Sequence, residues 1–307
     1  MKMMKRILSL LMLSSCLLLA NGVQAADRIK PFVLASKSTG DFDAKVGATR
    51  AALDVAGFEI VGEYSPYSDT YVDNVQIIVV TNAELRKAAL MSEFAGFAAP
   101  WRVAVTQVGG EIQVTYANPL YIANAYRLKS DLSNTNEALK DALGAQETFG
   151  SRKGLTARKL RKYHYTFGME YFDDPYELAE YDSHREALKV LEKNLAAGVA
   201  GVTQVYRLDL SDNVSVFGVA RKAPSEAEQA MDEGWIMNIV DFTELKGTAY
   251  LPIEILVEGD EIYALHMRFR MAVHFPDLKM MGANSFMNIM SSPAAVDKAL
   301  TAVAGGD

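Results

Sequence analysis

The chain of 307 residues has a single cysteine, Cys16, which lies in an apolar N-terminal stretch. Disulfide bonds, thiol nucleophiles, c-type haem attachment and thiolate metal sites are therefore excluded for the rest of the chain. The fold must be held by its hydrophobic core. A content of 50% hydrophobic residues makes this feasible.

Positive charge and recognisable chemical motifs are also scarce. The formal net charge is -7, and an acidic balance argues against nucleic acid or an anionic membrane as partner. The sequence shows no phosphate-loop spacing, calcium-loop pattern, Ser-His-Asp order or metal-spaced histidine cluster. We therefore predict no cofactor, no metal site and no catalytic residue, and an enzyme is not the favoured class.

Residues 1–25 have the layout of a secretory signal. A basic start is followed by an apolar run from Ile7 to Ala20 and a small-residue exit that ends at Ala25. We expect cleavage near Ala25, a location in the periplasm or outside the cell, and no stable membrane span in the remainder. The alternative is a lipoprotein anchored through Cys16, but three leucines follow that residue where a polar tether is normal.

Four sequence blocks recur in the same order in the two halves of the chain, which indicates an internal repeat. The pairs are LDVAGFEIVGEY (53–64) with LAAGVAGVTQVY (195–206), DNVQIIVV (73–80) with DNVSVFGV (212–219), PWRVAVTQVGGEIQVTY (100–116) with PIEILVEGDEIYALH (252–266), and NEALKDALG (136–144) with AAVDKALTAVAG (294–305). Alternating strands, hairpin turns and amphipathic helices predict two similar α+β domains. Each would be a mainly antiparallel sheet with packed helices.

The domain boundaries follow from these blocks. We expect a first repeat over 26–147, a polar linker over 148–160 and a second repeat over 161–307. The second repeat is longer than the first, and the extra residues predict an insertion near 222–249.

The same blocks resemble the domain-of-unknown-function 302 family. ALDVAGFEIVGEY and PWRVAVTQVGGEIQVTYANP carry the resemblance, and the matching blocks of the second half carry it more weakly. It covers most of the chain as two copies, and it implies two compact α+β domains with no assigned reaction. The second half departs from the pattern, because YANP at 116–119 becomes HMRF at 266–269.

The stretch ALHMRFRMAVHFPDLKMMGANSFMNIM (264–290) holds two of the four histidines and six of the fourteen methionines. Taken as a strand, it places its methionines on a core face and His266, Arg268 and Arg270 on the other face. Core packing is also expected for Met280, Met281, Met287 and Met290. The cationic face could bind a carboxylate or phosphate, or it could be a solvated surface that pairs with acidic residues.

A second unusual segment, KLRKYHYTFGMEYFDDPYELAEY (159–181), contains five tyrosines and His164. A histidine beside Tyr163 could bind a ligand or transfer protons. The alternative is a partly buried histidine that packs among tyrosines where the two domains meet.

These observations favour a non-catalytic module that binds a small ligand, with a small anion as one candidate, or an accessory protein. The candidate ligand-binding residues are His266, Arg268, Arg270, His164 and Tyr163. The alternatives are a His-dependent acid–base enzyme, a structural partner that docks in an envelope complex through the basic stretch RKGLTARKLRK (152–162), and a soft-metal (copper) protein. A copper site would require another element to bring methionines to the histidine face.

Overall fold

The computed structural model of the protein describes residues 27–67 and 70–306. The expected signal segment 1–25 and Cys16 lie outside these residues. Within the described ranges, no helix combines the length and the apolar character needed to cross a membrane.

The first half of the chain forms a six-stranded sheet in the order β3-β4-β5-β6-β2-β7, in which every neighbouring pair is antiparallel. Its elements are β2 (Phe32–Ser38), α2 (Phe42–Val55), β3 (Glu59–Tyr64), β4 (Asn74–Thr81), α3 (Ala83–Ala89), η1 (Ala95–Ala98), β5 (Trp101–Val108), β6 (Glu111–Ala117), α4 (Pro119–Ala125), α5 (Ser133–Leu143) and β7 (Glu147–Phe149).

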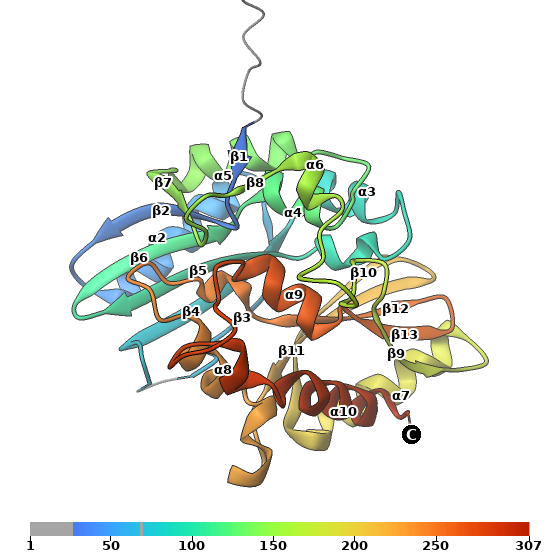
Figure 1. Cartoon of the computed structure of the whole chain (residues 1–307). Helices are drawn as coiled ribbons and strands as arrows, with labels where there is room; N and C mark the ends of the chain where they lie inside the picture. The colour runs from blue at the N-terminus through green and yellow to red at the C-terminus, as the bar shows by residue number, and fades with distance from the viewer. Residues whose placement is uncertain (1–26, 68–69, 307) are drawn as a thin grey trace, which may run out of the picture.

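The second half forms a five-stranded antiparallel sheet in the order β10-β11-β12-β13-β9 (Figure 1). Its elements are β9 (Tyr176–Glu180), α7 (His184–Ala196), η2 (Val199–Gly201), β10 (Val202–Ser211), β11 (Val214–Arg221), η3 (Glu226–Met231), α8 (Glu233–Val240), η4 (Thr248–Tyr250), β12 (Ile253–Glu258), β13 (Glu261–Ala264), α9 (Met267–His274), η5 (Phe286–Ile289) and α10 (Ser292–Ala304). Between the halves, β8 (Leu155–Thr156) pairs with β1 (Arg28–Ile29), and α6 (Ala157–Leu160) follows.

The protein is therefore α+β with mainly antiparallel sheets, as the sequence predicted. The strand order of the second sheet repeats that of the first, with β10, β11, β12, β13 and β9 in the places of β3, β4, β5, β6 and β2. The segment 148–160, expected as a linker, contains β8, α6 and most of β7. The expected insertion, 222–249, contains η3 and α8.

Local sequence explains where the elements begin and turn. Ser183 caps α7 by accepting a hydrogen bond from the Glu186 amide at 3.3 Å. Gly109 and Gly110 form the two-residue turn between β5 and β6. Both have positive φ, which type I′ hairpins require.

Each half covers one face of the other half's sheet. Gly96 of η1 lies against Leu256 of β12; a Cβ on Gly96 would come within 2.5 Å of Leu256 Cδ1. In the opposite direction, Thr248 of η4 hydrogen-bonds Thr106 of β5 at 2.6 Å between their hydroxyl oxygens. Both hydrophobic clusters of the core accordingly contain residues of both halves.

The stretch 264–290 corrects two predictions. It is not a strand beyond Ala264, because His266 starts α9, and the helix buries Met267 and Met271 one turn apart. The four later methionines are not core residues. The exposed fractions are 50% for Met280, 75% for Met281, 51% for Met287 and 69% for Met290.

Candidate functional site

A cavity of about 430 Å³ lies where α9, η5 and α10 meet the segment 161–176. Figure 1 shows this segment leaving α6, beside the first sheet, and leading to β9 at the edge of the second. Segments distant in sequence thus build the cavity. Its size falls within the usual range for small-molecule pockets.

Apolar side chains form most of the cavity wall. Three aromatic rings contribute, Tyr165, Tyr176 and Phe286. Six methionines contribute as well: Met169, Met267, Met271, Met280, Met287 and Met290. The exposed side chains of Met280, Met287 and Met290 therefore line a cavity. A ligand there would cover thioether groups that now face water.

His266 is placed at the polar end of the cavity by its position as the N-cap of α9. Its Nδ1 accepts a hydrogen bond from the Arg268 amide at 3.2 Å. In the first half, Asn118 caps α4 in the same way, its Oδ1 accepting from the Leu120 amide at 3.1 Å. The shared strand order thus places Asn118, not Tyr116, in the position of His266.

Glu170 contacts both polar residues at this end of the cavity. Arg268 donates to Glu170 Oε1 in an ion pair, and the Nε2 of His266 lies 3.3 Å from the same oxygen. Burial lowers the pKa of His266 to about 4, so the imidazole is neutral at neutral pH. Because Nδ1 accepts a hydrogen bond, the proton of the neutral ring sits on Nε2 and faces Glu170.

The contacts of the two His266 ring nitrogens bear on the hypothesis of a soft-metal (copper) site. Methionines do come to the side of His266, which a copper site requires. However, one ring nitrogen accepts from a backbone amide and the other carries a proton toward a carboxylate. The imidazole therefore has no free lone pair for a metal in this arrangement.

We predict that the stability difference between wild type and His266→Asn depends on pH. Asn preserves the cap, as Asn118 shows, but does not titrate. Between pH 6.5 and 4 the unfolded wild type binds a proton that the folded protein does not, so wild type loses stability relative to the variant as pH falls. Urea unfolding of both proteins from pH 7 to pH 4 measures this difference. A difference that stays constant would contradict it.

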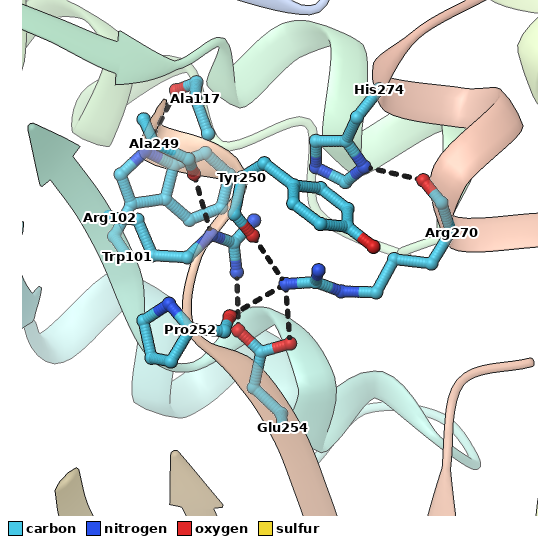
Figure 2. Close-up of polar contacts among 9 residues, drawn as sticks. All are labelled: Trp101, Arg102, Ala117, Ala249, Tyr250, Pro252, Glu254, Arg270 and His274. Carbon is cyan, nitrogen blue, oxygen red and sulfur yellow. Dashed lines mark hydrogen bonds and ion pairs between the residues drawn. The ribbon is translucent and has the colours of Figure 1, made fainter. Parts of the chain in front are cut away.

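Arg270 does not reach the cavity and belongs to a buried ionic cluster (Figure 2). Glu254 of β12 accepts from Arg102 of β5 at 2.7 Å and from Arg270 of α9 at 3.1 Å. All three side chains are at most 2% exposed. The cluster joins the first sheet, the second sheet and α9.

Backbone carbonyls complete part of the cluster's hydrogen bonding. Arg270 donates to the carbonyls of Tyr250 and Pro252, both at 2.7 Å, and Arg102 donates to that of Ala249 at 3.1 Å. The Tyr250 ring lies 4.3 Å from the Arg270 guanidinium carbon. The resulting role of Arg270 is structural: it holds α9 against β12 and η4, while Arg102 makes the contact between the two halves.

His164 and Tyr163 also lie apart from the cavity wall. Tyr163 donates to the Ala272 carbonyl at 2.8 Å, which fixes the segment to α9. His164 is half-buried, and its ring lies 4.5 Å from that of Tyr171. Of the five predicted ligand-binding residues, the structure brings only His266 and Arg268 together at the cavity.

A second cavity, of about 490 Å³, lies between the segment 147–152 and the residues around 240–247 and 275–279. Asp241 is buried in its wall, and burial raises the pKa of Asp241 to about 6. Its carboxylate accepts from the Gly247 amide at 2.8 Å and from the Tyr71 hydroxyl at 3.0 Å. These bonds occupy the carboxylate with structural contacts.

Sequence reasoning missed Glu170 and Asp297. The tyrosine-rich segment 159–181 supplies Tyr165 and Tyr176 to the cavity wall and Glu170 to the pair with Arg268. Asp297 was assigned only to an amphipathic helix, and no motif distinguished it. Among the described residues, no group of three or more His, Cys, Asp or Glu side chains is placed to hold a metal ion.

Comparison with known proteins finds similarity to one family of domains. A family model described as "Domain of unknown function DUF302" matches residues 34–145. A crystal structure of an uncharacterized conserved protein DUF302 from Bacillus stearothermophilus is similar over 35% of this chain and 92% of that chain, with 15% identity and a TM-score of 0.32. No curated protein matches the chain.

Proposed function

We propose a function from the site alone, because the family model that matches residues 34–145 describes a domain of unknown function. The protein is a non-catalytic module that binds a small, largely apolar ligand. The observation that carries the proposal is the cavity of about 430 Å³ behind α9, with aromatic and thioether walls and one polar end. We also propose that the second half is a second copy of the family domain, because it repeats the strand order of the first.

The polar end suits recognition better than catalysis. Arg268 and His266 both contact Glu170 Oε1, so the charge of Arg268 is paired. Two buried atoms remain without a partner, Glu170 Oε2 and Arg268 Nε. Unpaired buried polar atoms favour a ligand that offers a hydrogen-bonding group at that end. We propose that the protein works in the periplasm or outside the cell.

Filling the cavity should weaken binding without unfolding the protein. Ala294 is exposed at the rim of the cavity, on the first turn of α10, so Ala294→Trp adds an indole there at little cost to the core. We expect the neutral fluorophore N-phenyl-1-naphthylamine to bind wild type saturably and the variant at least tenfold more weakly.

The matched control is Ala51→Trp, at an exposed position of α2 far from α10 in the sequence, which should leave the affinity unchanged. The titration follows fluorophore emission with excitation above the tryptophan band. Equal binding by wild type and Ala294→Trp would show that the fluorophore binds elsewhere. Absence of saturable binding to wild type would contradict the proposed function.

A further inference from the structure

Asp297 is the charged residue of the cavity wall that lacks an opposite charge. Arg268 has its carboxylate partner in Glu170, whereas no cation among residues 27–67 and 70–306 pairs with Asp297. Its carboxylate accepts a hydrogen bond from the Thr301 hydroxyl at 3.4 Å. Burial raises the pKa of Asp297, as expected for a carboxylate that is partly removed from water without a counter-charge.

The cavity wall carries two charged side chains, Arg268 and Asp297, and His266 is neutral. Glu170, which contacts the wall residues from outside the lining, neutralises Arg268, so the negative charge of Asp297 is the one left over. The chain as a whole is also negative, at -7. An anionic ligand would meet an unpaired carboxylate, and the guanidinium that could attract it is already paired.

The wall beside Asp297 is of the type that accommodates cations. The rings of Tyr165 and Phe286 are 4.7 Å apart, and Tyr176 lies 4.2 Å from the ring of His266. Aromatic faces attract organic cations through their quadrupole, and polarisable thioethers pack well around irregular apolar groups. Tyr176 and Asp297 are close enough for the carboxylate to raise the pKa of the phenol, after burial as the larger cause.

We propose that the ligand of this cavity is an organic cation: an amine or quaternary ammonium whose positive end lies at Asp297 and whose apolar body contacts the methionine and aromatic walls. This inference rests on the proposed function, because it names the ligand class of the same cavity. It replaces the small anion, which the paired state of Arg268 and the burial of Arg270 disfavour.

Three matched probes test the charge preference. Benzyltrimethylammonium, its neutral isostere neopentylbenzene and the anion phenylmethanesulfonate have similar size and shape. We expect wild type to bind the cation at least tenfold more tightly than the neutral isostere, and the anion most weakly. Ligand-observed NMR titration at constant ionic strength measures all three affinities.

Variants locate the preference at one residue. Asp297→Asn should bring the cation and the neutral probe to equal affinity, whereas Asp297→Glu should keep most of the preference. Asp260→Asn removes the same charge from an exposed hairpin turn and should leave the ratio unchanged. Thermal unfolding of each variant shows that it is folded before the affinities are compared.

The outcomes separate this inference from the proposed function. Equal binding of the cation and the neutral probe by wild type would overturn the inference and leave the proposed function standing. A cation preference that survives in Asp297→Asn would also overturn it. If none of the probes bound wild type, both the inference and the proposed function would fail.

Discussion

Replacing Glu254 by Gln is expected to lower the free energy of unfolding by about 3–5 kcal/mol. The carboxylate is 1% exposed and is the counter-charge of both Arg102 and Arg270. Gln has nearly the same shape but no charge, so two guanidinium groups would remain buried without a carboxylate. Three of their nitrogens already have no hydrogen-bond partner: Arg102 Nη2, Arg270 Nε and Arg270 Nη1.

Glu261→Gln is the matched control for this substitution. Glu261 lies on the hairpin partner of β12 and is surrounded by the acids Glu180, Asp260 and Glu177; burial, then these neighbours, raise its pKa. Its neutralisation should change the stability by no more than about 0.5 kcal/mol. Urea unfolding at pH 7 measures both variants. A loss below about 1 kcal/mol for Glu254→Gln would mean that the two arginines find other compensation.

Regular patterns allowed much of the fold to be predicted from the sequence. Alternation and Gly-bearing turns identified the hairpins around 109–110 and 259–260, because a pleated strand with one buried face forces a period of two. Such signals are local in sequence, so they can be interpreted without knowledge of tertiary contacts.

The helix α9 shows where local patterns mislead. Its sequence alternates apolar and basic residues, which indicates a strand with one polar face. The helix is nevertheless stable because Arg270 meets a buried carboxylate from another strand and His274 is buried beside Tyr250. A helix buried on nearly all sides has no polar face to produce a 3.6-residue period, so the false period of two was the stronger signal.

The candidate site was predictable only where its residues are adjacent in sequence. His266 and Arg268 are neighbours on one turn and were identified together. Asp297 lines the same cavity from about 30 residues away, and Glu170 contacts His266 and Arg268 from about 100 residues away; only the tertiary fold places them there. The exposed methionines of 280–290 were misjudged, because composition does not distinguish a cavity rim from a core.

The second large effect is expected for Leu256→Ala, which should lower the free energy of unfolding by about 2–5 kcal/mol. Leu256 is fully buried in the second sheet, and its Cδ1 occupies the space that the missing Cβ of Gly96 leaves free. Truncation therefore creates a cavity at a contact between the halves. Leu90→Ala is the control, because Leu90 is 50% exposed and its truncation leaves no buried void.

The two tryptophans show whether the halves unfold together. Trp101 lies in the first sheet, and Trp235 lies in α8 of the second half, where it packs against the hydrophobic cluster that does not contain Leu256. In single-tryptophan proteins made by Trp→Phe exchange, Leu256→Ala should shift both fluorescence transitions by the same amount. Equal shifts are expected if the two halves unfold as one cooperative unit, and we expect that because η1 covers the second sheet and η4 covers the first. Two transitions that move independently would instead describe two separable domains, and the buried Arg102–Glu254 pair would then have to break before either sheet unfolds.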